Sequence, residues 1–186
     1  METLDNVLTR RSANRLTGPA PDDAELEVLL KAAMTAPDHG RLLPWRLVTL
    51  RGEDRVELGR CLAGLAADDP GARERAAAKP LRAPLLLAIV FSPVEHPKVQ
   101  RWEQLAATAA VVHTLSLLLH DRGYASIWRT GPATEDSGVR GLHGLGPGEQ
   151  LLGWLYAGTS MVAAPPRRPY EVGPRLIALA DIAGPN

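Results

Sequence analysis

Apolar residues recur at helical spacing in several parts of this chain and predict most of its helices. Leu4, Val7 and Leu8 predict a short first helix, and Asp22 or Asp23 is suited to cap a second one. Similar patterns predict helices over residues 53–67, 71–79, 102–122 and 135–142. The buried stripe of the second helix is expected to consist of Leu26, Leu29, Leu30, Ala33 and Met34.

Strands are predicted by alternation and by short apolar runs. Residues 46–50 alternate between apolar and polar side chains, as a half-covered strand does. The run 84–91, PLLLAIVF, predicts a central strand that is covered on both faces. Further strands are predicted over 124–129, 150–157 and 175–180. Because helices and strands alternate without a visible boundary, we expect one domain over residues 1–186, of α+β or α/β class with a mixed sheet.

The helix over 102–122 is apolar on nearly every side and should end at Gly123, which suits a left-handed cap. Its apolar residues cannot share one face: Leu105, Ala106, Ala109, Val112, Leu115, Leu118 and Leu119. A helix of this kind is buried all round. It is either the centre of the core or is covered by a partner subunit, and the second alternative predicts a dimer.

The composition is that of a globular protein and does not favour a nucleic-acid or membrane partner. Hydrophobic residues make up 45% of the 186 residues, and 21 Lys and Arg balance 21 Asp and Glu. The single cysteine, Cys61, excludes an internal disulfide framework and agrees with a reducing cytoplasm. The most apolar stretch, 105–119, is too short for a membrane span, so we expect a soluble cytoplasmic protein. No Cys and His spacing predicts a metal site.

The common motifs of nucleotide-binding and hydrolytic enzymes are missing. The sequence contains no Walker loop, no G-x-S-x-G and no H-E-x-x-H. The glycine-rich segment 141–148, GLHGLGPG, precedes a predicted strand, whereas a dinucleotide-binding fingerprint follows a strand and opens a helix. No serine or cysteine has a recognisable base partner. We therefore expect neither a Rossmann NAD site nor a catalytic nucleophile.

Arg10, Arg11 and Ser12 are the first candidate binding residues. Guanidinium groups bind phosphate oxygens through paired hydrogen bonds and are always charged. Two of them beside a hydroxyl at the end of a helix therefore suit a phosphate group. The alternative is that they only cap the carboxyl end of the first helix, whose dipole favours cations.

Three further segments combine aromatic and charged residues. The loop 36–45 holds His39, which can donate to an anion or a carbonyl, and Trp45, which offers a wide apolar wall. Segment 127–131, IWRTG, lies at the carboxyl end of a predicted strand, where ligands of open sheets bind. Segment 98–103, KVQRWE, opens the long helix. Each segment also has a structural alternative: a well-packed turn, a strand end with a solvated arginine, and an ordinary helix start.

Taken in order, these segments resemble the FMN-dependent nitroreductase superfamily, and most closely its shortest bacterial members, of the NAD(P)H nitroreductase type. The resemblance covers about residues 4–159. It rests on Arg10-Arg11-Ser12, Ala36-Pro37-Asp38-His39, Pro44-Trp45, Arg101-Trp102-Glu103-Gln104, Ile127-Trp128-Arg129-Thr130-Gly131 and Gly153-Trp154-Leu155-Tyr156-Ala157-Gly158-Thr159.

The resemblance implies an α+β fold, a three-layer sandwich with a central mixed β-sheet flanked by helices. It also implies an intertwined homodimer with two FMN molecules at the interface. Arg10, Arg11 and Ser12 would hold the phosphate and ribityl group of FMN, and Thr35 and His39 would reach the flavin from the other protomer. The residues that would line the flavin ring and the phosphate side are Trp128, Arg129 and Thr130.

The activity that the resemblance implies is a ping-pong transfer of hydride from NAD(P)H through FMN to a nitroaromatic, quinone or similar acceptor. Because the cofactor carries the chemistry, no protein nucleophile or Rossmann motif is needed. Two alternatives share the same binding residues. One is a flavin-binding sensor or carrier without turnover, and the other is oxygen-dependent chemistry at the flavin site.

Two parts of the chain depart from the family pattern. Leu43 stands before Pro44 where relatives often carry Gln, so a hydrogen bond to the flavin edge is expected to be lost. The tail over 159–186 is rich in proline and extended, and it either exchanges with the partner protomer or folds back on its own chain. Larger relatives place a Lys-x-Arg pair of their tail on the phosphate. The candidates for that role here are Arg167, Arg168 and Arg175.

Overall fold

Four antiparallel strands form the central layer of the fold, in the order β1-β2-β4-β3. The computed structural model describes residues 2–66, 68–163, 167, 169–179 and 182. The strands are β1 (Trp45–Leu50), β2 (Leu85–Phe91), β3 (Ala125–Arg129) and β4 (Gln150–Gly158). Each begins and ends within one residue of its predicted bounds, and the α+β class is confirmed. Among the described residues, the one parallel contact is an isolated bridge between Ser12 and Ser126, at the edge of β3.

β2 is the buried centre of the sheet, as its unbroken apolar sequence predicts. It pairs with β1 on one side and with β4 on the other, and all its residues are buried. Because side chains alternate along a strand, Leu85, Leu87 and Ile89 pack into one core cluster. Leu86, Ala88 and Val90 pack into a second cluster on the opposite face. The two clusters produce the three-layer arrangement.

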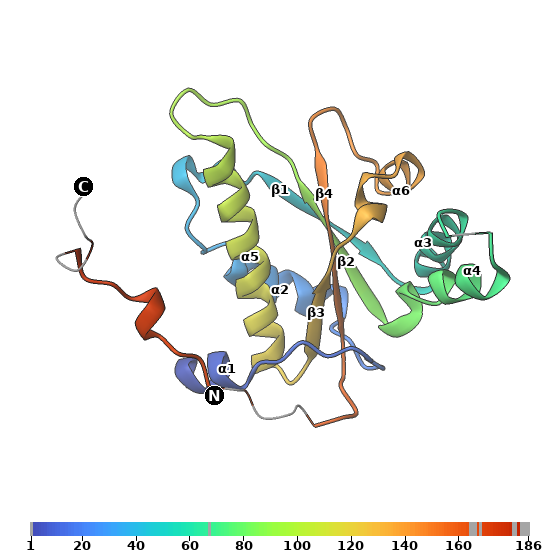
Figure 1. Ribbon diagram of the computed structural model, residues 1–186, viewed down its shortest axis with the longest axis horizontal. Helices are drawn as coiled ribbons and strands as arrows, with labels where there is room; N and C mark the ends of the chain where they lie inside the picture. Colours follow the sequence, from blue (N-terminus) through green and yellow to red (C-terminus); the bar gives the residue numbers. More distant parts are fainter. Residues whose placement is uncertain (1, 67, 164–166, 168, 180–181, 183–186) are drawn as a thin grey trace.

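Helices α2 (Asp23–Ala33) and α5 (Arg101–Asp121) cover the first face of the sheet (Figure 1). The predicted cap of α2 is confirmed, since Asp22 Oδ1 accepts a hydrogen bond from Glu25 N at 2.8 Å. The predicted end of α5 is confirmed too, because Gly123 is left-handed, with φ +83°. Met34 was expected in the buried stripe of α2 but is 39% exposed, because it follows the last helical turn.

Helices α3 (Gly52–Gly64) and α6 (Ser137–Leu142) cover the second face, and α4 (Pro70–Ala77) packs on α3 (Figure 1). The contact of α3 with α4 is close: a Cβ on Gly59 would lie 2.5 Å from Ala77 O. The helix predicted over 135–142 is split into η3 (Pro132–Glu135) and α6. The split occurs at Asp136, whose carboxylate caps α6 by accepting from Val139 N at 2.9 Å.

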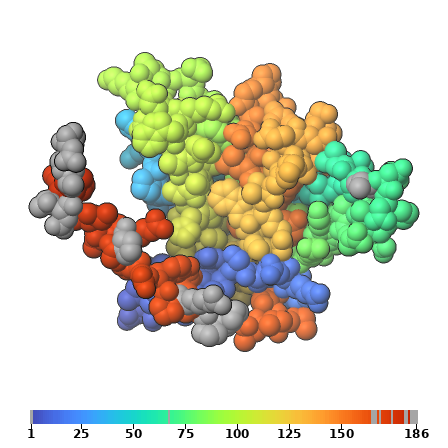
Figure 2. Space-filling view, viewed as in Figure 1, coloured from blue at the N-terminus to red at the C-terminus, as the bar shows by residue number. Residues whose placement is uncertain are grey.

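The chain ends lie outside this three-layer core. Helix α1 (Thr3–Thr9) has no buried residue, and Asn6 Nδ2 holds it to α5 by donating to Leu117 O at 3.1 Å. The strand expected over 175–180 is wrong for residues 175–179: Arg175 ends the short turn η4 (Gly173–Arg175), and residues 176–179 form no strand. Residue 180 lies outside the described residues. A strand needs a neighbour to pair with, and this segment lies apart from the strands (Figure 1) and projects from the body of the molecule (Figure 2).

An apolar stripe of α5, which includes Trp102 and Leu105, stays uncovered in the single chain. Val112, Leu115 and Leu119 are buried as expected, but Trp102 is 69% and Leu105 is 39% exposed. The side of α5 that faces the core is therefore buried as expected, whereas the opposite side is exposed in the single chain. In the part of the chain that the structure describes, no helix is long and apolar enough to cross a membrane.

Candidate functional site

Guanidinium groups gather where α1 ends. Arg10 is the C-cap of α1, and Arg167 of the tail donates from Nη2 to the main-chain carbonyl of Arg10 at 2.9 Å. Arg11 donates from Nη1 to Leu8 O at 2.5 Å and to Arg10 O at 2.9 Å. Arg11 thus performs the helix-capping role that the sequence left open, whereas the guanidinium of Arg10 has no hydrogen bond to a described residue.

Three cations form this arginine cluster: Arg10, Arg11 and Arg167. Among the described residues, no carboxylate forms an ion pair with any of the three. Burial and the two neighbouring cations lower the pKa of Arg10. Burial, followed by the charge of Arg10, also lowers the pKa of His120 at the end of α5. The cluster is therefore a local positive field that suits an anion.

The segment after α1 runs along the free edge of β3. Ser12 forms a parallel bridge with Ser126, and Ala13 N donates to Ser126 O at 3.2 Å. Because the bridge is parallel, Arg10 and Arg11 lie toward the start of β3, and the chain then runs along the strand to Asn14, near the end that carries Trp128 to Thr130. The structure therefore places six of the predicted site residues along one strand edge, with Arg10, Arg11 and Ser12 toward the start of β3 and Trp128, Arg129 and Thr130 toward its end.

Trp128 and Arg129 lie on opposite faces of β3, as neighbours in a strand must. Trp128 donates from Nε1 to Leu152 O at 3.0 Å and leaves 38% of its surface exposed. Arg129 donates from Nη2 to Asn14 Oδ1 at 3.1 Å, and its Cζ lies 5.5 Å from the centre of the Tyr156 ring. Its Nε is buried without a partner. An unsatisfied buried donor at this edge fits a site that a ligand completes.

Thr35 and His39 lie in the loop between α2 and β1. Thr35 is exposed, and its hydroxyl donates to Ala32 O at 2.8 Å. His39 lies in η1 (His39–Arg41), and its Nδ1 is 2.9 Å from Glu103 Oε2 at the start of α5. Leu43, the residue that departs from the family pattern, is left-handed with φ +47° and 47% exposed.

The arginine cluster and the loop that carries Thr35 and His39 do not meet within one chain. Thr9 Oγ1 lies 3.0 Å from His120 Nε2, which places the arginine cluster at the carboxyl end of α5. Glu103 places His39 at the amino end of the same helix. The helix between Glu103 and His120 spans roughly 25 Å at about 1.5 Å per residue. That distance is longer than an FMN molecule.

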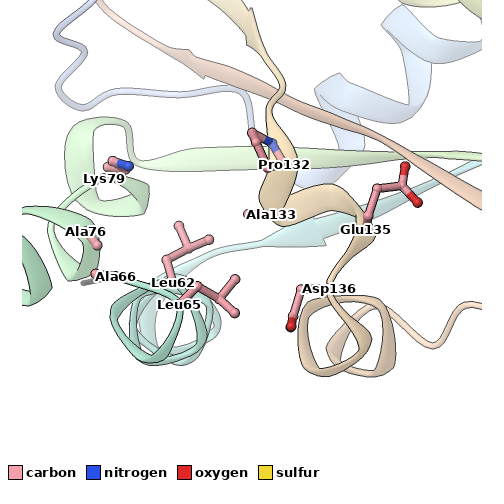
Figure 3. A pocket seen from close by; sticks show the side chains of 9 residues that line it. All are labelled: Leu62, Leu65, Ala66, Ala76, Lys79, Pro132, Ala133, Glu135 and Asp136. Atoms are coloured by element: carbon pink, nitrogen blue, oxygen red, sulfur yellow. The ribbon is translucent and has the colours of Figure 1, made fainter. Parts of the chain in front are cut away.

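A cavity of about 330 Å³ opens beside the arginine cluster, between α1, α5 and the tail. Arg10 and Arg167 line it together with His113, and its apolar walls come from Val7, Leu8, Leu117 and Tyr170. A second cavity of about 400 Å³ lies between α3, α4 and η3 (Figure 3). Leu62, Leu65 and Ala133 face that space, while Glu135 and Asp136 point in different directions. Because its polar groups do not converge, the second cavity is not the candidate site.

Comparison with known proteins decides the family. The model of the Nitroreductase family matches residues 7–159. The chain belongs to the nitroreductase family. It is 36% identical over 167 residues to "Putative NAD(P)H nitroreductase YdjA" of Escherichia coli, with 88% of this chain and 91% of the relative covered. A Haemophilus influenzae protein called "Putative NAD(P)H nitroreductase" is 30% identical over 169 residues, with 88% and 91% covered.

Solved structures share the fold. A nitroreductase-like family protein from Bacillus cereus has a TM-score of 0.84 at 24% identity, and 96% of each chain is covered. The FMN and NADPH-dependent nitroreductase NfnB from Sphigopyxis sp. strain HMH has a TM-score of 0.70 at 20% identity, with 100% of this chain and 99% of that chain covered. The expected membership of the nitroreductase superfamily is thus confirmed.

Sequence reasoning did not assign a role to Asn14, Glu103 or Tyr156, nor did it choose among the arginines of the tail. Asn14 and Tyr156 hold the Arg129 side chain; Tyr156 belongs to segment 153–159, which contributes to the family resemblance, but nothing in the sequence indicates that either residue contacts Arg129. Among the tail residues, Arg167 lies at the cluster, whereas Arg175 is exposed in η4. Arg168 lies outside the described residues.

Proposed function

We propose that this protein is an FMN-dependent oxidoreductase that transfers hydride from NAD(P)H through the flavin to a nitroaromatic, quinone or similar acceptor. One observation carries the proposal. In a chain of the nitroreductase family, three arginines lie together without an ion pair to any described carboxylate. The names of its relatives agree, since the Escherichia coli protein is called an NAD(P)H nitroreductase and NfnB is described as FMN and NADPH-dependent. In this proposal the protein works in the cytoplasm.

The residues at the edge of β3 fit FMN in charge and shape. Arg10, Arg11 and Ser12 hold the phosphate and the ribityl group, because guanidinium groups suit a dianion. The exposed ring of Trp128 offers a flat wall to the flavin, and Thr130 adds a hydroxyl. Arg129, whose buried Nε has no partner among the described residues, adds a positive charge at the end of β3, on the face opposite Trp128. When bound, FMN supplies the hydride chemistry, and the chain supplies position and charge.

The proposed active form is a homodimer in which each flavin contacts both chains. The arginine cluster and the Thr35–His39 loop lie at opposite ends of α5, so both reach one FMN when two chains pack with α5 helices side by side and antiparallel. The uncovered stripe of α5 offers the required apolar surface. The tail exposes further apolar side chains that a partner can cover: Met161, Val162, Tyr170, Val172, Leu176, Ile177 and Leu179.

In this arrangement the chain's residues bind and orient rather than react. The arginines fix the phosphate end, Trp128 limits water at one side of the ring, and His39 and Thr35 approach from the second protomer. NAD(P)H and the acceptor use the same open face in turn, so neither needs a Rossmann site. The proposed chemistry requires no nucleophile from the chain.

An anaerobic reduction experiment tests the activity. The purified yellow protein is expected to bleach when NADH or NADPH is added under argon and to recover its colour when a nitroarene or quinone is added without oxygen. Yellow protein that neither cofactor bleaches would favour a flavin-binding sensor or carrier. Bleached protein that only oxygen restores would favour oxygen-dependent chemistry.

A further inference from the structure

The two carboxylate oxygens of Glu103 have partners on two different elements. Oε1 accepts a hydrogen bond from Gln100 N at 2.9 Å, which closes the capping box of α5. Oε2 lies 2.9 Å from Nδ1 of His39 in η1. The hydrogen bond from His39 is the largest cause that lowers the pKa of Glu103, so the carboxylate is charged. Because a charged carboxylate only accepts, Nδ1 of His39 carries the donated proton.

The remaining ring nitrogen of His39 is available to a ligand. The side chain of His39 is 60% exposed, whereas that of Glu103 is 24% exposed. The loop around His39 is also held: Asp38 Oδ2 accepts from Leu43 N at 2.8 Å, and Arg41 and Leu43 are both left-handed. Left-handed residues other than glycine persist where the surroundings determine the backbone. The ring is therefore fixed through Nδ1 on a constrained loop, and Nε2 has no hydrogen bond to a described residue.

We propose that Glu103 is a positioning residue, which holds the imidazole of His39 by Nδ1 so that Nε2 meets the FMN bound by the other protomer. This inference rests on the proposed function, because His39 has a flavin to contact only if the site is shared across a dimer. It assigns to Glu103 two roles in one carboxylate: helix capping through Oε1 and tautomer selection through Oε2. The contact ties the amino end of α5 to the loop that reaches the flavin.

A double-mutant cycle over Glu103 and His39, read by equilibrium titration with FMN, tests the inference. Glu103→Ala is expected to weaken FMN binding about tenfold in the wild-type background and less than about twofold in the His39→Ala background. Glu103→Ala has the smaller effect in the His39→Ala background because the hydrogen bond between the two residues is already lost there. Glu103→Gln is expected to recover only part of the affinity, since its single amide oxygen can accept either from Gln100 N or from His39 Nδ1, while the amide nitrogen only donates.

Asp54→Ala is the matched control for the loss of a helix cap. Asp54 closes the same kind of capping box in α3 by accepting from Arg51 N at 3.2 Å, on the other face of the sheet. This variant is expected to lower thermal stability without changing the affinity for FMN. Nitrogen-15 spectra of the flavin-free protein add a second readout: His39 is expected to be protonated at Nδ1 in the wild type, with a shift toward the Nε2-protonated tautomer in Glu103→Ala.

The outcomes separate the two proposals. An equal effect of Glu103→Ala in both backgrounds, or a His39 ring that lacks a proton on Nδ1 in the wild type, overturns the positioning role while the proposed function stands. Wild-type protein that takes up no FMN overturns both.

Discussion

Arg167, in the C-terminal tail, donates a hydrogen bond to the main-chain carbonyl of Arg10, at the end of the first helix, across a distance of 2.9 Å. The contact joins residues that are 157 positions apart in the chain. It adds a third guanidinium to Arg10 and Arg11, and a bound anion would offset the repulsion among the three charges. The tail therefore contributes to the candidate site.

The first prediction separates the two described arginines of the tail. Arg167→Ala is expected to weaken FMN binding about tenfold, because one charged contact with the phosphate region is lost. Arg175→Ala is the matched control and is expected to leave the affinity unchanged, since Arg175 is exposed in η4. Fluorescence titration with FMN measures both. A larger effect of Arg175→Ala would contradict the assignment of Arg167.

The second prediction concerns the phosphate role of Arg10. Arg10→Ala is expected to lower the free energy of FMN binding by about 1.5–3 kcal/mol, the typical contribution of one hydrogen bond to a charged group. Riboflavin, which lacks the phosphate, should lose much less. Arg60→Ala on α3, where Arg60 pairs with Glu57 on the surface, serves as the control for removing an arginine. Unchanged FMN retention in Arg10→Ala would rule out the phosphate role.

The third prediction tests the uncovered stripe of α5 as the dimer interface. Leu105→Asp is expected to produce monomers and to release the flavin together, because a buried unpaired carboxylate strongly disfavours an interface. Leu142→Asp is a matched control, since Leu142 is 40% exposed against 39% for Leu105 and lies in α6 on the other face of the sheet. Sedimentation velocity and the flavin absorbance report both properties. Dimers of Leu105→Asp that retain FMN would place the interface elsewhere.

The fourth prediction concerns stability in acid. Arg46 donates to Glu149 at 2.9 Å and 2.7 Å, and this bond, the largest cause, lowers the pKa of Glu149 from 4.5 to about 2. A carboxylate with a depressed folded-state pKa stabilises the fold above its unfolded pKa, and the contribution is lost as the pH falls through the folded value. Stability should therefore fall between about pH 4.5 and pH 2. The network joins β1 to the start of β4, so its loss affects the sheet.

Glu149→Gln provides the test of that network. The variant is expected to be less stable at pH 7 by about 1–3 kcal/mol, because Arg46 loses its charged acceptor. It should also lose part of the decline in stability between pH 4.5 and pH 2. Chemical denaturation at several pH values measures both. An equally steep decline in the variant would show that other carboxylates control acid unfolding.

The sequence predicted the helices and strands that carry a strong local pattern. The apolar run of β2 and the caps at Asp22 and Gly123 are examples, because burial on both faces and end geometry each leave a mark in neighbouring residues. The tail strand was wrong because a strand depends on a pairing partner that the chain's own sheet does not provide. The exposure of the apolar stripe of α5 has the same cause. An apolar segment predicts that its side chains are buried, but it does not indicate whether the same chain or a partner chain covers them.

Part of the candidate site was predictable, namely the residues whose type and order along the chain indicate a ligand. Arg10, Arg11 and Ser12 stand together in the sequence, and so do Trp128, Arg129 and Thr130. The pairing of Ser12 with Ser126 lays the first group along the strand that carries the second, and it depends on strand-edge geometry. The contacts of Arg129 with Asn14 and Tyr156 span distant segments, so no spacing rule indicates them.

The most direct measurement is an FMN titration of the flavin-free protein followed by absorbance, with its mass in solution determined on the same sample. The account predicts a yellow dimer that saturates at one FMN per chain. A colourless monomer that takes up no added FMN would contradict it.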